Sequence, residues 1–227
     1  MHRLKIPSAI YPFLIKILFE YNKNNLNKNI TIQILEFVEA FLVRRAIVGF
    51  EPTGLHALFK GVWEDISSNP TKASLKKEII KRPTIQYPTN KQLKEAIKTR
   101  PLANSRICSF ILRELDVSIK GDTPSDPISI EHVLPNIYPE NNEWGKLFNK
   151  DQHKTLKDTI ANLIPLSIPL NSSIQNRPYK EKQERYLNES MFISAREFAK
   201  KWNKWDIESI EKRSTELYEW IKNRWSE

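Results

Sequence analysis

Apolar residues recur at helical spacing near both ends of the chain, and this periodicity constrains the fold more than any other feature of the sequence. The last stripe has a member every three or four positions: Ile207, Ile210, Ser214, Leu217, Ile221 and Trp225. Such spacing gives a helix one apolar face. Only 5 of the 227 residues are glycine, which disfavours a β-rich fold with many tight turns. The sequence therefore predicts a mainly α protein with a long C-terminal helix.

Shorter runs predict further helices in the first half of the chain. Thr31 is a candidate N-cap, and Gly49 a candidate stop, for one of these helices. Three more helices are expected over residues 52–66, 90–98 and 104–115. The start of the chain is expected to be helical rather than a signal peptide, because prolines and a lysine interrupt its apolar part. No stretch is long and apolar enough to cross a bilayer.

The texture of the sequence changes after residues 121–127 (GDTPSDP), which form the clearest linker. Directly beyond it, the alternating β-branched residues at 128–130 predict a short strand. Segment 162–170 is apolar but contains two prolines, so we expect a short strand that runs into a loop. This organisation divides the chain into a helical region, 1–120, and a second region, 121–227.

The net charge of +9 is concentrated in the middle of the chain. Residues 71–120 carry 12 Lys and Arg against 4 Asp and Glu. Concentrated positive charge attracts polyanions such as DNA and speeds their encounter. The alternative interpretation is an ordinary solvated face, and charge alone does not decide between the two.

Cys108 is the only cysteine, which excludes an internal disulfide framework and a cysteine-based zinc site. It lies in the apolar run 107–112, and this favours a small buried hydrophobe over a reactive thiol. A single thiol fits a reducing cytoplasm, which is the expected location. The glycine-rich patterns of nucleotide-binding loops are absent from the sequence.

The residues that suggest a reaction lie beyond the linker. The predicted strand delivers Glu131 and His132 side by side, and Asn162 and Asn171 follow, nine positions apart. Hydrolysis of a phosphodiester needs a base to activate water and a hard cation to neutralise charge on the phosphate. Histidine titrates near neutral pH, so His132 is the candidate base. Carboxylate and amide oxygens, as in Glu131 and an asparagine, are ligands that Mg²⁺ accepts.

The adjacency of Glu131 and His132 sets a geometric condition, because neighbouring side chains on a strand point to opposite faces. The two side chains can serve one site only if the strand ends or bends there. Pro135, three residues after His132, supports an end at this point.

This arrangement resembles the ββα-metal, or HNH, nucleases, in which an acidic residue and a histidine precede a hydrophobic-x-proline sequence. It is most similar to the C-terminal nuclease domain of GmrSD-type modification-dependent restriction endonucleases and related phage-defence nucleases. The matching residues are Ile130-Glu131-His132, Pro135, Trp144, Asn162-Leu163, Leu166, Leu170-Asn171, Asn176, Lys182 and Tyr186. The last helix and segment 37–66 also resemble parts of full-length members, so the resemblance covers most of the chain.

The chain departs from that family pattern in two respects. Ala161 stands where the family usually has glycine. Nothing matches the DGQQR-like motif of the family's N-terminal nucleotide-sensing domain, so nucleotide binding is not carried over. A C-terminal fragment or a truncated relative is therefore expected.

The resemblance implies a mainly α (α+β) fold with a ββα-metal motif, and a metal-dependent DNA endonuclease in restriction or defence against phage. The cofactor would be Mg²⁺ or Mn²⁺. The partners would be DNA, including modified phage DNA, and a nucleotide-sensing domain or subunit, with no membrane. The site would consist of catalytic His132, Asn162 and Asn171, metal ligands Glu131 and Asn171, and phosphate-contacting or supporting Asn176, Arg177, Lys180 and Lys182.

Each of these residues also has an ordinary structural interpretation. Asn162 and Asn176 could belong to turns, and Asn171 could cap a helix. Lys182 could be a solvated lysine, and the polar neighbours of His153 favour a surface position for it. The tryptophans of the last hundred residues are expected in the core rather than as base-stacking platforms.

Two other functions remain open at this stage. A non-catalytic DNA-binding module would bind DNA through the basic stretch, in a salt-sensitive manner that survives loss of His132. A helical module that partners a sensor domain would form a stable protein complex and show no affinity for DNA.

Overall fold

The computed structural model describes residues 8–119, 127–138 and 140–226, and the chain divides into two compact units. Unit 1 comprises Met1–Leu93 with Trp220–Glu227, and unit 2 comprises Lys94–Glu219. The linker expected at 121–127 lies, apart from Pro127, outside the described residues. The boundaries between the two compact units fall inside helices α5 (Asn90–Thr99) and α12 (Ile207–Arg224). The basic stretch 71–120 is therefore shared between the units.

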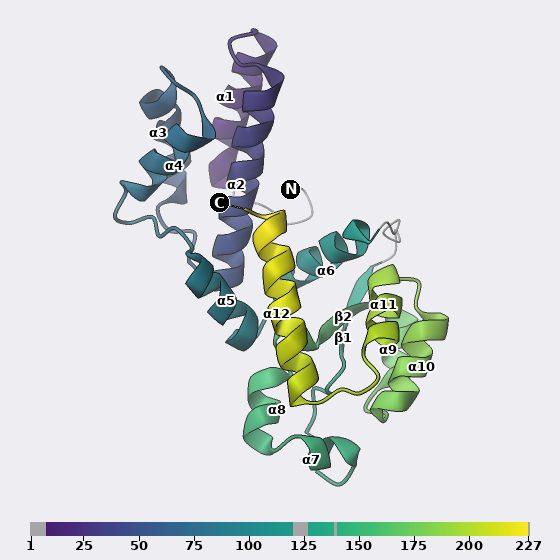
Figure 1. Cartoon of the computed structure of the whole chain (residues 1–227). Coiled ribbons are helices and arrows are strands. Elements are labelled where there is room, and N and C mark those ends of the chain that lie inside the picture. The colour runs from purple at the N-terminus through teal and green to yellow at the C-terminus, as the bar shows by residue number, and fades with distance from the viewer. Residues whose placement is uncertain (1–7, 120–126, 139, 227) are drawn as a thin grey trace. The chain divides into compact units, whose positions relative to one another are not determined.

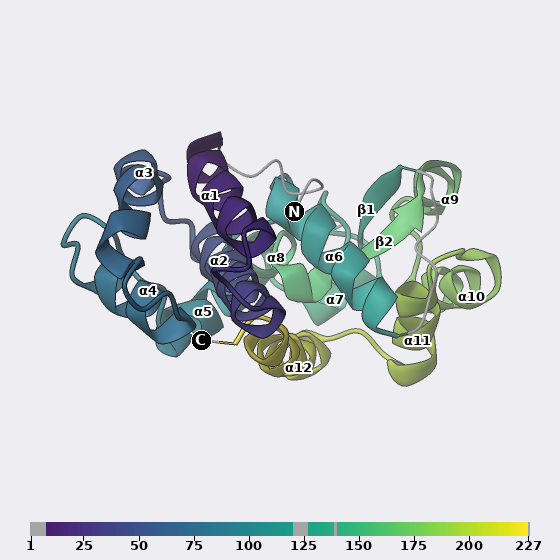
Figure 2. The same cartoon turned by 90° about the horizontal axis from the view of Figure 1, so that it is seen from above.

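Unit 1 is built from helices around one apolar core. A short 3-10 turn, Ser8–Ile10, precedes four helices: α1 (Tyr11–Asn22), α2 (Lys28–Val48), α3 (Leu55–Ile66) and α4 (Lys72–Ile80). Helices α1 and α2 lie side by side, and α3 and α4 pack on them (Figures 1 and 2). Their buried faces include Phe13, Phe41 and Phe59, each at most 1% exposed. The predicted helices over 31–49 and 52–66 are thus confirmed.

Of the two capping residues predicted for α2, the structure confirms one. Gly49 ends the helix in the left-handed conformation, with φ of 88°, which glycine adopts without strain. Thr31 is not the N-cap. The side chain of Asn27 accepts the hydrogen bond from Ile30 N, and the helix starts at Lys28. Thr31 lies inside the first turn and donates to Asn27 O.

Unit 2 contains a two-stranded antiparallel sheet surrounded by short helices. Strand β1 (Ile128–His132) pairs with β2 (Leu163–Ser167), so that His132 lies opposite Leu163. The helices, with the first part of α12, are α6 (Arg106–Ser118), α7 (Glu143–Leu147), α8 (Lys150–Leu156), α9 (Ile168–Ile174), α10 (Tyr179–Glu189) and α11 (Ile193–Lys201). Figure 1 shows α9, α10 and α11 gathered beside the sheet. The mainly α prediction is confirmed.

The segment after β2 differs from its prediction. The expected short strand is present, but it runs into helix α9 rather than into a loop. Proline is tolerated in the first turn of a helix, where no backbone N–H is required, and Pro169 occupies that turn. Ser167 caps the helix by accepting from Leu170 N. Helices α7 and α8 lie between the two strands in the chain, and the ββα-metal motif stays a prediction.

An aromatic cluster links the helices of unit 2. Its closest pair is Phe198 and Trp205, whose ring centroids are 4.7 Å apart. Tyr179 stacks on Trp205, and Tyr186 packs edge-on against Phe198. Buried aromatic side chains with a polar tip usually direct it to a hydrogen-bond partner. Here Tyr186 OH donates to Glu131 of β1, and Trp205 Nε1 donates to Asn162 just before β2. Across the described residues, no helix has the length and apolar character to span a membrane.

Candidate active site

His132 is the last residue of β1, and its imidazole meets a carboxylate from a segment far along the chain. His132 Nε2 lies 3.0 Å from Asp158 Oδ1, and the two side chains are 19% and 24% exposed. An ionised carboxylate only accepts hydrogen bonds, so Nε2 carries the proton and Nδ1 keeps its lone pair. Within the described residues, Nδ1 has no hydrogen-bond partner. In a neutral imidazole with this tautomer, Nδ1 is the nitrogen that can accept a proton.

Asp158 was not among the residues predicted for the site. Lys157 Nζ approaches its other oxygen, Oδ2, at 3.3 Å. Burial acts to raise the pKa of the Asp158 carboxyl, but the hydrogen bond to His132 and the charge of Lys157 outweigh it and lower the pKa. Asp158 therefore stays ionised at neutral pH and fixes the tautomer of His132. Its one signal in the sequence is its place shortly before Asn162, which by itself does not distinguish it from other surface aspartates.

Asn162 is completely buried and uses all its hydrogen-bonding capacity. Its Oδ1 accepts from Leu134 N at 2.7 Å and Trp205 Nε1 at 3.0 Å. Its Nδ2 donates to Leu134 O at 2.9 Å and Lys157 O at 2.8 Å. An asparagine amide has two donors and two lone pairs, so none remains for a substrate. Asn162 joins the turn after His132 to the segment that carries Asp158.

Arg213 of α12 holds the backbone on both sides of Asn162. Its guanidinium donates to Ala161 O and Leu163 O, each at 2.8 Å. The group is 6% exposed and lies over the ring of Phe198, 4.6 Å from the centroid. Burial lowers the pKa of Arg213 to about 10, so the side chain is still charged at neutral pH.

Glu131 points away from His132, as alternation along a strand requires. It is 5% exposed. Its Oε1 accepts from Lys182 Nζ and Tyr186 OH, each at 2.7 Å. Lys182 also donates to His132 O at 2.8 Å and Val133 O at 3.1 Å. The sequence predicts Glu131 as a metal ligand and Lys182 as a residue that contacts phosphate or supports the site; in the fold the two side chains pair with each other.

Asn171 braces β1 from helix α9. Its Nδ2 lies 2.6 Å from Ser129 Oγ and 3.1 Å from Ile130 O. A carbonyl oxygen only accepts, so the amide nitrogen is the atom that faces the strand. Asn171 is half-buried and contacts β1 before His132, rather than His132 itself.

The three remaining predicted residues lie at the surface around the start of α10. Asn176, Arg177 and Lys180 are all exposed. Arg177 pairs with Glu181 at 2.8 Å, and Lys180 donates to Gln183 at 3.2 Å. The structure does not bring them into contact with His132 or Asp158.

His153, expected at the surface, is buried. It is 5% exposed, and its Nε2 donates to Pro135 O at 2.7 Å. The ring of Tyr138 packs edge-on against it, with centroids 5.2 Å apart. Burial lowers the pKa of His153 below its ordinary value of 6.5. The polar neighbours misled the prediction, because one helix turn carries them outward while His153 faces the loop after β1.

Of the two predicted metal ligands, Glu131 does not fit a divalent cation as arranged. Glu131 is already neutralised by the Lys182 ammonium, beside which a second cation would be repelled. Asn171 directs its amide nitrogen to β1, and among the described contacts its Oδ1, the atom that could bind a cation, has no partner. Over the residues that the structure describes, no group of three or more His, Cys, Asp or Glu side chains could hold a metal ion.

A hollow of about 190 Å³ adjoins Asp158. Its other lining residues come from the loop between α5 and α6: Pro101, Ala103, Asn104 and Ser105. Leu102 N donates to Asp158 O at 2.8 Å, which fixes this loop beside the His132–Asp158 pair. The hollow lies beside Asp158, and His132 is not among its lining residues.

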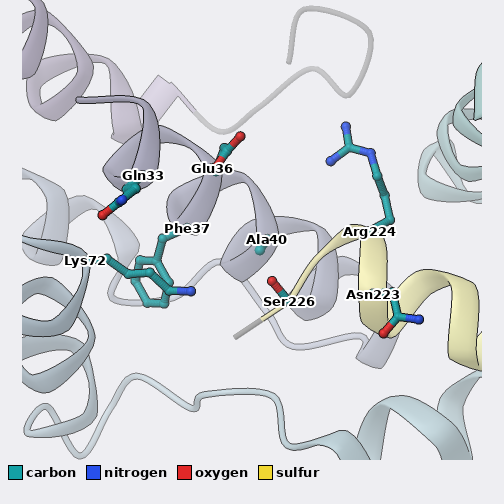
Figure 3. Close-up of a pocket in the computed structure, with 8 residues that line it drawn as sticks. All are labelled: Gln33, Glu36, Phe37, Ala40, Lys72, Asn223, Arg224 and Ser226. Carbon is teal, nitrogen blue, oxygen red and sulfur yellow. The ribbon is translucent and has the colours of Figure 1, made fainter. Parts of the chain in front are cut away.

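Unit 1 has a cavity of its own, of about 450 Å³, shown in Figure 3. Its lining comes from α2, α4 and the end of the chain: Gln33, Glu36, Phe37, Ala40, Lys72, Asn223, Arg224 and Ser226. This set includes no histidine and a single carboxylate. It offers no counterpart of the His132–Asp158 pair.

Comparison with known proteins identifies one family. A family model described as GmrSD restriction endonucleases, C-terminal domain, matches residues 87–220. The matched segment nearly coincides with unit 2 and includes His132, Asp158, Asn162 and the Glu131–Lys182 pair. No curated protein and no solved structure matches the chain.

Proposed function

Because the chain belongs to the family of C-terminal domains of GmrSD restriction endonucleases, we propose that unit 2 hydrolyses phosphodiester bonds of DNA with His132 as general base. The observation that supports the proposal is the contact between His132 Nε2 and Asp158 Oδ1. It leaves Nδ1 of His132 as the nitrogen that can accept a proton. A base oriented by a carboxylate in this way is a recurrent device in hydrolytic enzymes.

The reaction that this geometry supports is direct attack by water. His132 Nδ1 takes a proton from the water as its oxygen forms a bond to phosphorus. The bond between phosphorus and the leaving oxygen breaks, and that oxygen takes a proton from solvent. Asp158 stabilises the positive charge that His132 gains. Asn162 and Arg213 do not touch the substrate in this scheme; they hold the two backbone segments that carry the pair.

The cofactor remains a prediction. Mg²⁺ or Mn²⁺ would supply positive charge to the phosphate and the leaving oxygen. Glu131 does not fit that task as the fold arranges it, so no step above passes through a metal. Omission of divalent ions and addition of EDTA test the requirement directly.

The proposed biological role is based on the family to which the chain belongs. We propose a role in restriction or defence against phage, with modified phage DNA as one substrate and a nucleotide-sensing domain or subunit as a partner. Cleavage of modified against unmodified DNA, with and without nucleotide, tests these points.

The direct experiment is cleavage of supercoiled plasmid by the full chain over a range of divalent ions. Wild type should nick or linearise the plasmid, whereas the cleavage rate of His132→Ala should be lower by about a hundredfold or more. His56→Ala is the matched control, because His56 is an exposed histidine of unit 1. Equal trace cleavage by wild type and His132→Ala would refute the proposal. DNA binding that persists without any cleavage would favour a non-catalytic DNA-binding module.

A further inference from the structure

The side chain of Lys182 is only 1% exposed, although lysine side chains are rarely fully buried. Its ammonium has three N–H donors, and three acceptors surround it. They are Glu131 Oε1 at 2.7 Å, His132 O at 2.8 Å and Val133 O at 3.1 Å. Every donor is therefore used, and none is left for a phosphate.

Burial of such a charge needs a compensating group. Removing an ammonium from water is costly unless an opposite charge and hydrogen bonds replace the solvent. Glu131 supplies the charge, and Tyr186 OH donates to the same carboxylate oxygen at 2.7 Å. Burial lowers the pKa of Lys182 although Glu131 acts against that shift. The Glu131 carboxylate thus has its partner inside the protein.

The two carbonyls bound by Lys182 belong to the point where β1 ends. Backbone carbonyls that leave a sheet inside a protein need new partners, and Lys182 serves those of His132 and Val133. From the other side, Val133 N donates to Asn162 O at 3.0 Å, and the Asn162 side chain binds both N and O of Leu134. The backbone from His132 to Leu134 is therefore fixed from two directions.

We infer that Lys182 is a positioning residue for His132, and that Glu131 is its counter-ion rather than a metal ligand. For its catalytic meaning, this inference rests on the proposed function of His132. The ammonium stands beside Glu131, where the resemblance to HNH nucleases places a cation, and it is tethered to the backbone that carries the base. It acts on the reaction only through the orientation of the imidazole.

The test compares Lys182→Met, Glu131→Gln and the double variant with wild type in the full chain. Met keeps the length of the side chain without the charge, and Gln keeps an acceptor for Tyr186. The matched control is Lys200→Met, which removes a lysine from an exposed ion pair with Glu197. All assays are run below the melting temperature of the least stable variant.

Lys182→Met should lower kcat about a hundredfold with little change in KM, because a small misplacement of the base costs about that factor. The double variant should unfold at a higher denaturant concentration than Lys182→Met, since no lone carboxylate stays buried. Its kcat should remain low, because the carbonyls of His132 and Val133 still lack their donor. Stability and activity then separate, which a merely structural pair would not produce.

Two readouts do not depend on cleavage. The ¹⁵N signals of the His132 ring, recorded at one pH, should shift in Lys182→Met and stay unchanged in Lys200→Met. Mn²⁺ binding is measured by electron paramagnetic resonance without DNA. Wild type and Glu131→Gln should bind Mn²⁺ equally, or neither should bind it. If wild type fails to cleave DNA, the proposed function fails, and these two readouts still decide the inference.

Two results would overturn the inference. One is a Lys182→Met protein with wild-type kcat and unchanged ring signals. The other is Mn²⁺ binding by wild type that is lost in Glu131→Gln, which would make Glu131 a metal ligand.

Discussion

Units 1 and 2 each bury an arginine between two backbone carbonyls. In unit 1, Arg45 is 4% exposed and donates to Gln86 O and Glu51 O. In unit 2, Arg213 is 6% exposed and donates to two carbonyls as well. The chemistry of the two guanidinium groups is the same, since each satisfies acceptors that the fold removes from water.

The surroundings of the two arginines differ. The carbonyls bound by Arg213 flank Asn162, which in turn holds the turn after His132. Around Arg45, the ring partners are Phe41 and Phe50, and no titratable pair with an open side lies among its described contacts. Of the two buried guanidinium groups, Arg213 is the one whose carbonyl partners adjoin Asn162, which binds the turn after His132.

The largest expected effect is at Asp158, which has no counterpart among the residues of unit 1 that the structure describes. Asp158→Asn should lower kcat for DNA cleavage by about 10²–10⁴-fold, because an amide does not hold His132 in the required tautomer. Single-turnover cleavage under saturating protein measures it. Asp151→Asn, an exposed change on α8, is the control. A wild-type rate in Asp158→Asn would remove the feature that separates the two units.

The next effect compares the two arginines directly. Arg45→Met and Arg213→Met should each lower the free energy of unfolding by about 2–4 kcal/mol, because each leaves two buried carbonyls without donors. Urea denaturation measures both losses. At a temperature where both variants are folded, only Arg213→Met should also slow DNA cleavage. Equal cleavage by the two variants would show that Arg213 supports the fold alone.

A smaller effect concerns pH. Burial holds the pKa of His153 below its ordinary value of 6.5, so the unfolded chain binds a proton at this residue more readily than the folded one. The stability contributed by neutral His153 is complete above pH 6.5 and is lost as pH falls toward the lowered pKa. Urea denaturation between pH 7.5 and 5 should show a smaller loss in His153→Gln than in wild type. Identical pH dependence would place the titration elsewhere.

The smallest effects are expected at the exposed start of α10. Arg177→Ala and Lys180→Ala should each change the free energy of unfolding by less than about 0.5 kcal/mol. If they contact phosphates as the family pattern suggests, each should reduce the slope of log affinity against log salt by about 1. DNA binding by fluorescence anisotropy over a salt series measures this. An unchanged slope would leave both residues outside the DNA interface.

Several features that depend on residues close together in the sequence were predicted correctly, whereas contacts between residues far apart in the sequence were not. The helix that ends at Gly49, the strand at 128–132 and the last helix depend on signals within a few positions, and the structure contains all three. The contact between His132 and Asp158 spans 26 positions, and that between Lys182 and Glu131 spans 51. Nothing in the local pattern selects these partners. His153 was misplaced for the same reason, since its burial depends on the loop after β1.

The sequence by itself determined the helical character of the chain, the strand that presents His132, and the family to which unit 2 belongs. Only the tertiary structure decided the partners of the charged side chains: Asp158 for His132, and Lys182 for Glu131. Periodicity and capping act through neighbours along the chain, so they can be read from it directly. A buried charged side chain pairs with whichever opposite group the completed packing brings within hydrogen-bonding distance, because no water remains there to stabilise the charge.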